Sequence, residues 1–202
     1  MTSVFLRCPS TLLATLILCL LLSVPVAASV RVSGIEFAPA IRIGETELPL
    51  RGGGLFRYAA VFRVYAGVLY APAGVANSDI LGADVPKRLE LHYLLNISAE
   101  DFRRSGTALI EKQRGPEILA VLGERLEKFN AAYKDIEKGD RYALEYHPDQ
   151  GTRLLKNGTE LVRVPGLDFA QAYFGIWLDP QEPLSSRFRD DLLTSVNSGR
   201  AS

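Results

Sequence analysis

The residues best suited to bind a ligand are Arg57, Arg63 and Tyr65, which lie within an otherwise apolar run. The run extends from Leu55 to Tyr70, follows three glycines at 52–54, and is rich in β-branched and aromatic residues. Such residues favour strands. Alternating positions leave both faces largely apolar, which predicts one long central strand covered on both sides. Buried charges need partners, so these three residues are candidate ligand-binding residues.

The spacing of these residues limits what they could bind together. Arg57 and Tyr65 are eight residues apart, so an unbroken strand places them on one face, about 26 Å from each other. A single carboxylate could then touch both only if the chain bends or bulges near Ala59-Ala60, or if the glycine segment folds back. Arg63 would share the face of Tyr65 at about 7 Å.

A guanidinium binds a carboxylate through two hydrogen bonds, and a phenol adds one donor. The alternative is structural. Arg57 would then pair with a neighbouring acidic residue, Arg63 would form a salt bridge to the adjacent strand, and Tyr65 would be a core aromatic.

Residues 1–28 have the features of a secretory signal peptide. Arg7 precedes an uncharged apolar run at 12–22, and small residues at 26–28 offer a cleavage site. The run is shorter than the roughly 20 residues that span a bilayer, although a retained N-terminal anchor is the alternative. We expect a periplasmic or secreted protein with one domain at 29–202 and no transmembrane segment after signal removal. Both cysteines, Cys8 and Cys19, leave with the signal, so the mature chain has no thiol.

Charge and histidine content exclude several functions. The chain has 23 basic and 23 acidic residues and no long basic run, so we do not expect nucleic-acid binding. His92 and His147, the two histidines, have neither metal-ligand spacing nor a neighbouring serine motif. The glycines at 52–54 lack the lysine and hydroxyl residue of a phosphate loop, and are better explained by a tight crossing of chains. We expect no metal, no cofactor and no catalytic residue.

Periodicity predicts an α+β fold, with an antiparallel sheet and its helices on one face. Strands are expected at 41–43, 47–50, 87–95 and 141–146, and at 152–155 and 160–164 around the hairpin signal Asn157-Gly158. Helices are expected at 99–112, about 118–133, 168–178 and 185–196. The helix at 168–178 has an apolar stripe of Phe169, Tyr173, Ile176 and Trp177 that either lines a ligand cavity or belongs to the core.

Taken together, these segments resemble the bacterial branch of the chalcone isomerase-like family. The resemblance rests on Gly53 to Arg57, Arg63 to Tyr70, Lys138-Gly139-Asp140, Gly151-Thr152, Asn157-Gly158 and Phe174 to Leu178. The second of these is similar to the family segment Lys-Val-Tyr-x-Gly-x-x-Tyr. The match runs from about Gly34 to Leu193 and implies the chalcone isomerase-like open-faced β-sandwich.

Relatives with this fold include plant isomerases that close chalcones to flavanones and plant fatty-acid-binding proteins without known catalysis. The resemblance implies that Arg57 is the family's arginine, which steers the substrate phenolate in the isomerases and holds the carboxylate in the binders. It also implies that Tyr65 is the tyrosine used by the binders, where the isomerases have a threonine. The resemblance therefore favours binding over chalcone isomerisation.

Three hypotheses follow. The first is a secreted or periplasmic, non-catalytic binder of a fatty acid or similar apolar carboxylate, with Arg57, Tyr65 and Arg63 as ligand-binding residues. The second is an isomerase acting on an enone or aromatic substrate. The third is a structural or interaction protein of the cell envelope with a filled core. A cavity beside these residues distinguishes the first two from the third.

Overall fold

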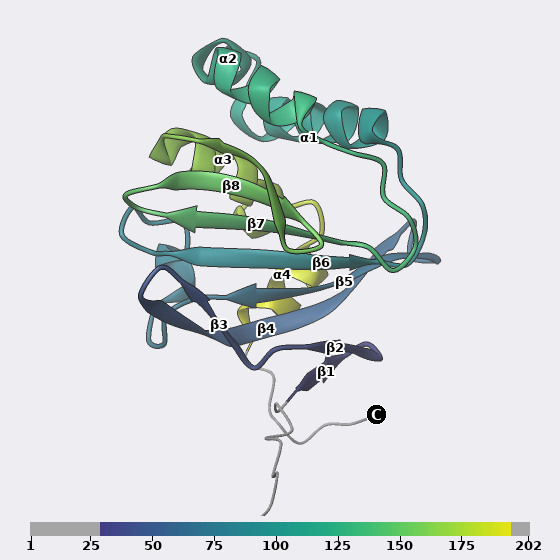
Figure 1. The fold of residues 1–202 in the computed structure, drawn as a ribbon. Coiled ribbons are helices and arrows are strands. Elements are labelled where there is room, and N and C mark those ends of the chain that lie inside the picture. Colours follow the sequence, from purple (N-terminus) through teal and green to yellow (C-terminus); the bar gives the residue numbers. More distant parts are fainter. Residues whose placement is uncertain (1–28, 195–202) are drawn as a thin grey trace, which may run out of the picture.

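A curled antiparallel sheet of seven strands forms the framework of the computed structural model, which describes residues 29–194 (Figure 1). Neighbouring strands in the sheet are consecutive in sequence, in the order β3 to β9. The strands are β3 (Ala40–Ile43), β4 (Thr46–Tyr58), β5 (Phe62–Tyr70), β6 (Lys87–Tyr93), β7 (Arg141–His147), β8 (Gly151–Lys156) and β9 (Thr159–Val164). A separate hairpin is formed by β1 (Val30–Val32) and β2 (Ile35–Phe37).

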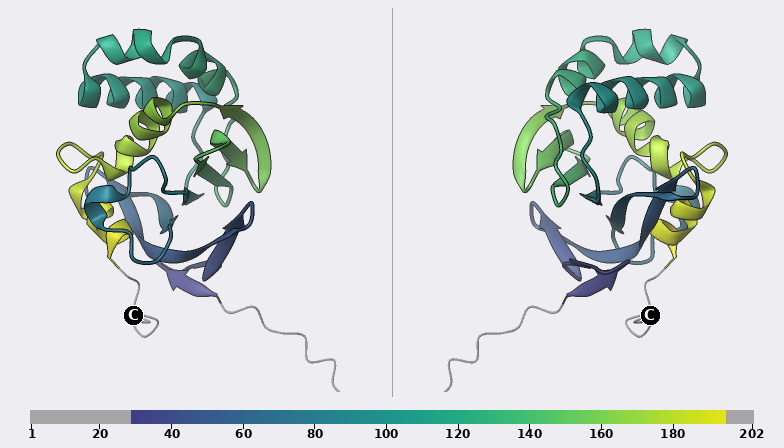
Figure 2. Two further views of the ribbon diagram at one scale, coloured as in Figure 1. Left: turned by 90° about the vertical axis from the view of Figure 1, so that its left-hand side faces the viewer. Right: turned by 90° about the vertical axis from the view of Figure 1, so that its right-hand side faces the viewer.

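Four α-helices pack on one face of this sheet, as the sequence predicts. They are α1 (Ala99–Arg114), α2 (Glu117–Ala131), α3 (Leu167–Leu178) and α4 (Ser186–Leu193), and a short 3-10 turn covers Asn77–Asp79. All four helices contribute buried residues to one large core with the sheet, whereas β1 and β2 cover the opposite face in a second, smaller core. Figure 2 shows the curl of the sheet and the helices gathered above and beside it. The predicted α+β architecture is confirmed.

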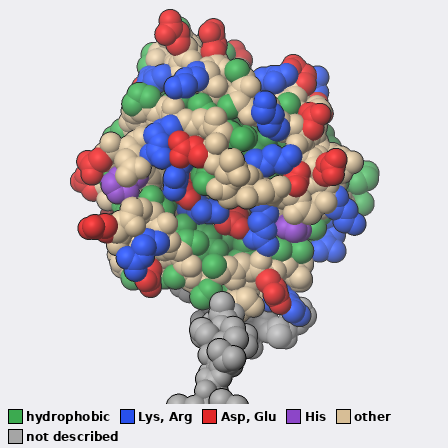
Figure 3. Space-filling model, in the orientation of Figure 1, with side chains coloured by type: hydrophobic (Ala, Val, Ile, Leu, Met, Phe, Trp, Pro, Cys, Tyr) green, Lys and Arg blue, Asp and Glu red, His purple; other side chains and the backbone are tan. Residues whose placement is uncertain are grey.

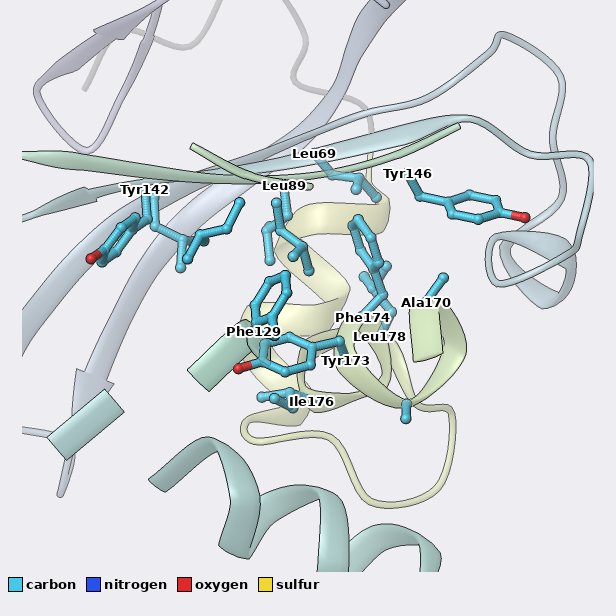
Figure 4. Packing of buried hydrophobic residues seen from close by; sticks show 14 of the residues in the cluster. Leu69, Leu89, Phe129, Tyr142, Tyr146, Ala170, Tyr173, Phe174, Ile176 and Leu178 are labelled. Atoms are coloured by element: carbon cyan, nitrogen blue, oxygen red, sulfur yellow. The ribbon is translucent and has the colours of Figure 1, made fainter. Parts of the chain in front are cut away.

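The main core lies between the sheet and α3. That helix is apolar around most of its circumference, which is typical of a helix buried on all sides. Figure 4 shows Tyr173 and Ile176 of α3 beside Phe129 of α2, below Leu69 and Leu89 of the sheet. The core thus holds α3 rigidly against the strands.

The stretch predicted as one long strand is instead a hairpin of β4 and β5. Val61 N donates to Tyr58 O (3.2 Å), and the two residues between them, Ala59 and Ala60, have φ angles of 50° and 61°. Two consecutive positive φ angles are typical of a type I′ turn, which matches the twist of a β-hairpin. The prediction of a single strand was wrong because alanine carries no turn signal and rarely adopts this conformation.

A β-bulge in this hairpin reverses the alternation of side chains on β5. Phe56 pairs with Tyr65, but the next residue, Arg57, pairs with Arg63, so Val64 is an extra residue. A bulge of this kind moves the following residues to the other face. The prediction that Arg63 and Tyr65 share a face was therefore wrong.

The glycines at 52–54 let α4 cross β4 at very short range. A Cβ atom on Gly52 would lie 2.5 Å from Leu192 O, and one on Gly54 would lie 2.5 Å from a carboxylate oxygen of Asp191. No side chain larger than hydrogen fits at these positions, which agrees with the tight crossing expected from the sequence. The crossing fixes β4 beneath the C-terminal helix.

Two predicted features fall partly or wholly outside the described residues. The signal peptide at 1–28 lies outside them, as do the last two residues of the helix predicted at 185–196. Within residues 29–194, no helix has the length and hydrophobicity needed to cross a membrane. The same residues contain no cluster of three or more side chains suited to bind a metal ion.

The sheet also buries one lysine, Lys87, which is 1% exposed at the start of β6. Its ammonium donates to Val85 O (2.6 Å) and lies 4.3 Å from the centre of the Tyr146 ring. Burial lowers the pKa of Lys87 to about 7 because it disfavours the charged form. At neutral pH, the amine of Lys87 in the folded protein is therefore close to its pKa.

Replacement of the Ala59-Ala60 turn by Asn-Gly is expected to stabilise the protein. Each alanine is held in a left-handed conformation that asparagine and glycine adopt more readily, so the double variant should gain about 1 kcal/mol or more in free energy of unfolding. Urea denaturation measures the change. The reverse exchange, Asn157→Ala with Gly158→Ala in the β8–β9 turn, should destabilise. A double Ala59→Asn, Ala60→Gly variant that is less stable than the wild type would contradict this geometry.

Lys87 predicts a rise in stability with pH. Unfolded lysine, with an ordinary pKa of 10.5, keeps its proton where folded Lys87 loses it. The unfolded state then binds more protons, so the free energy of unfolding should rise by about 2 kcal/mol from about pH 7 to about pH 9. Lys87→Met should remove this rise, and Lys128→Met on the exposed side of α2 should retain it. Equal slopes in wild type and Lys87→Met would contradict the assignment.

Candidate functional site

A cavity of about 890 Å³ lies between the sheet and helices α1 and α3. This volume is within the range of roughly 300–1,000 Å³ that is typical of small-ligand sites. Strand β6 provides Leu89, Leu91 and Tyr93, and Leu95 lines the cavity just beyond the strand; these four residues form the face that the sequence predicts to be apolar. Helix α1 forms the opposite wall through residues from Asp101 to Lys112, and the end of α3 forms a side. A pocket therefore lies beside Tyr65, whereas the third hypothesis expects none.

Packed aromatic rings form one wall of the cavity, centred on Tyr65. The Tyr65 ring stacks on Phe56 at 4.9 Å between centroids and meets Tyr93 and Phe188 edge-on, each at 5.5 Å. Such pairs favour fixed relative orientations and bury large apolar areas. The wall is therefore both apolar and well positioned before any ligand enters.

Few polar atoms face this apolar space. Trp177 Nε1 donates to the Tyr65 hydroxyl (2.9 Å), which leaves the hydroxyl proton of Tyr65 available to another acceptor. The Tyr133 and Tyr173 hydroxyls bond to each other at 2.9 Å. The Tyr93 hydroxyl has no hydrogen-bond partner among the described residues. Tyr65 and Tyr93 can therefore each offer a hydrogen bond to a bound molecule.

The electrostatics of the cavity suit hydrogen-bond donation rather than proton abstraction. Burial raises the pKa of Tyr65, Tyr93 and Tyr173, so these phenols stay protonated at neutral pH. The one carboxylate in the wall, Asp101, pairs with Arg104 at 2.7 Å. Neither histidine of the chain lines the cavity. Its described wall therefore offers donors and cations but no free base.

Positive charge stands at the edge of the cavity on the exposed side of α1. Arg104 and Lys112 both line it, and Lys112 forms no salt bridge within residues 29–194. The neighbouring Gln113 donates to Gly175 O (3.2 Å), two residues before Trp177. Lys112, Trp177 and Tyr65 therefore line the same cavity, and the C-terminal part of α1 that carries Lys112 packs against α3.

The sequence-predicted residues are divided between the two faces of the sheet. Tyr65 lies in the cavity wall, whereas Arg57 and Arg63 do not line the cavity. The two arginines stand opposite each other on β4 and β5, on the side of the β1–β2 hairpin, where Arg63 Nη2 donates to Ser33 O (3.4 Å). The structure thus brings Arg57 and Arg63 together but separates both from Tyr65. Their role in ligand binding stays a prediction.

Arg57 also lines a second, more polar hollow of about 590 Å³ at the edge of β4. The hollow lies between β1 and α4, and its other charged residues are Arg31, Arg187 and Asp191. Burial raises the pKa of Asp191, and the nearby Arg187 opposes that rise. Polar walls make this hollow less suited than the main cavity to an apolar molecule.

Sequence reasoning missed Lys112 and Tyr93 as site residues. Lys112 is on the polar face of a predicted helix, and nothing in the sequence distinguishes it from other solvent-exposed lysines. Tyr93 was placed correctly on an apolar strand face, but its unpaired hydroxyl depends on contacts between distant segments. The apolar stripe predicted on α3 did indicate part of the cavity wall. Tyr173, Ile176 and Trp177 line the cavity, whereas Phe169 belongs to the core.

Comparisons with known proteins agree with this architecture. The chalcone isomerase-like family model matches residues 29–194, so the chain belongs to this family. Among solved structures, the fold is similar to that of a fatty-acid binding protein from Arabidopsis thaliana, with a TM-score of 0.60 and 20% sequence identity. That match covers 82% of this chain and 96% of the plant chain. The comparison with curated proteins gave no significant match.

Proposed function

We propose that this protein binds a fatty acid or similar apolar carboxylate, without transforming it, in the cavity between the sheet and α1. The observation that carries the proposal is the cavity itself, which has a volume of about 890 Å³ and is lined mainly by leucine and aromatic side chains. Such walls favour an alkyl chain by the hydrophobic effect. Likeness of the fold to a plant fatty-acid binding protein supports the same choice.

The carboxylate is placed at the end of the cavity beside Lys112. An ionised carboxylate is costly among apolar side chains unless a cation or several donors accompany it. Lys112 supplies the cation, and the hydroxyl of Tyr65, already held by Trp177, supplies a donor. The alkyl chain then extends along Leu89 and Leu91 of β6.

Binding is preferred to catalysis because the cavity lacks a proton acceptor. An isomerase that abstracts a proton from an enone or aromatic substrate needs a base close to the reacting atoms. The described wall holds protonated phenols, and its carboxylate is engaged by Arg104. Arg57, which by resemblance would steer the substrate phenolate of an isomerase, does not line the cavity.

We also propose that the protein works after export, in the periplasm or outside the cell. The features of residues 1–28 described above support this placement. The absence of cysteine from the rest of the chain is compatible with an oxidising compartment, where an unpaired thiol would be reactive.

Substitution of Lys112 tests how the carboxylate is held. Lys112→Gln should weaken the affinity for a long-chain fatty acid about tenfold, because a charge-assisted contact is lost. The affinity for the fatty alcohol of equal length should not change. Isothermal titration calorimetry of the delipidated protein measures both ligands.

Lys128→Gln on α2 is the matched control, because it removes an exposed lysine that does not line the cavity. It should bind both ligands like the wild type. Equal weakening of acid and alcohol by Lys112→Gln would point to a packing effect instead. Failure of the wild-type protein to bind either ligand would overturn the proposed function.

Arg57→Ala distinguishes the cavity arrangement from the expectation based on resemblance. If Tyr65 and Lys112 hold the carboxylate, Arg57→Ala should bind fatty acid in solution with unchanged affinity, whereas Tyr65→Phe should bind several-fold more weakly. If Arg57 holds the carboxylate, its removal should abolish binding. Fluorescence titration with a labelled fatty acid separates these results.

A further inference from the structure

The tip of the β4–β5 hairpin, residues 57–63, is exposed over its whole length and is unusually apolar. Of the four large hydrophobic residues that are mainly exposed in the described part of the chain, three lie here. Tyr58 is 68% exposed, Val61 is 72% exposed and Phe62 is 62% exposed. Exposed apolar residues that cluster in this way mark surfaces for a protein or a membrane. In Figure 3, hydrophobic side chains protrude at the right-hand edge, where this hairpin ends in Figure 1.

Cations flank the apolar tip on both strands. Arg57 and Arg63 are direct cross-strand partners, and like charges in this position repel each other. Neither arginine forms a salt bridge with another residue in the range 29–194. An anionic group between or beneath them would relieve the repulsion. The combination of apolar apex and basic flanks complements a lipid surface with negative headgroups.

The two alanines of the turn keep the apex of the hairpin apolar but strain its backbone. Ala59 and Ala60 occupy left-handed positions in which asparagine and glycine are less strained. The β8–β9 turn of the same chain uses Asn157-Gly158 for this geometry. At the β4–β5 tip, the chain instead keeps uncharged methyl side chains that can enter a bilayer without desolvating an amide.

The apolar tip is continuous with the edge of the ligand cavity. Tyr58 and Phe62 are cross-strand partners that line the cavity while remaining mainly exposed. Arg104 of α1 lines the same cavity and is exposed. A molecule leaving the cavity past the tip therefore meets aromatic side chains first, and then whatever surface the tip contacts.

We propose that the β4–β5 hairpin tip docks the protein on an anionic lipid bilayer, with Val61 and Phe62 in the interface and Arg57 and Arg63 on headgroup phosphates. This inference rests on the proposed function, because docking serves to pass the apolar ligand between membrane and cavity without exposing it to water. The docking surface itself is built from the tip alone.

Vesicle flotation of the delipidated full-length mature protein tests the docking. Wild-type protein should partition into vesicles of phosphatidylcholine with phosphatidylglycerol about tenfold more strongly than into phosphatidylcholine alone, and added salt should weaken this binding. Val61→Asp should reduce partitioning into the anionic vesicles about tenfold or more, because it places a charge at the apolar apex. Arg57→Gln and Arg63→Gln should each reduce it about fivefold.

Matched variants elsewhere serve as controls. Val121→Asp changes an apolar residue of α2 that is 59% exposed. Arg42→Gln changes an exposed arginine of β3, which pairs with the end of β4 opposite the tip. Both should partition like the wild type. Equal partitioning of wild type and Val61→Asp, or equal binding to neutral and anionic vesicles, would overturn the proposal, as would self-association through the tip in place of vesicle binding.

Fatty-acid affinity measured without vesicles separates this proposal from the function on which it rests. Val61 does not line the cavity, so Val61→Asp should keep the affinity of the wild type. Vesicle binding without fatty-acid binding would support the docking surface and overturn the proposed ligand. Fatty-acid binding without vesicle binding would overturn the docking surface alone.

Discussion

The extra residue Val64 in the ladder between β4 and β5 determines which side chains of this hairpin face the cavity. Because Phe56 pairs with Tyr65 and Arg57 pairs with Arg63, both arginines lie on the outer face, and an aromatic wall lies on the inner face. Without the bulge, Arg63 would share the face of Tyr65 and would introduce a charge into an apolar space. The bulge therefore places the two arginines on one face of the hairpin and the aromatic side chains on the other. The separation of the ligand cavity from the basic tip depends on it.

Close packing elsewhere keeps this arrangement in place. Helix α4 crosses β4 over Gly52 and Gly54, where any side chain would collide with it, and Phe188 of that helix supports the Tyr65 ring from behind. On the other side of the cavity, Gln113 ties α1 to α3. The hydrogen bond between Trp177 and Tyr65 then joins α3 to the sheet. The cavity walls are thus connected through the core, and the hairpin tip projects beyond it.

Much of the fold could be predicted from the sequence, because periodicity and turn chemistry act locally. The strand at 87–95 showed its cavity face by alternation, and Asn157-Gly158 marked its hairpin by residue type. The Ala59-Ala60 turn gave no such signal, since the ladder between β4 and β5 imposes the left-handed conformation on residues that do not prefer it. No residue type marks the bulge at Val64 either, so the sequence could not predict on which face of the sheet Arg57 and Arg63 lie. The family resemblance located the segment that contains Arg57, Arg63 and Tyr65, and the three-dimensional register shows that this segment is a hairpin and which side chains face the cavity.

The central claim, that an alkyl chain lies inside this cavity, is tested most directly through Trp177. It is the only tryptophan of the chain and lines the cavity beside Tyr65. A fatty acid brominated along its chain quenches tryptophan fluorescence on contact, whereas the unbrominated acid of equal length does not. The structure predicts saturable quenching of Trp177 at one acid per protein, displaced by the unbrominated acid. Binding of the brominated acid by calorimetry with unchanged Trp177 fluorescence would contradict the claim and place the ligand elsewhere.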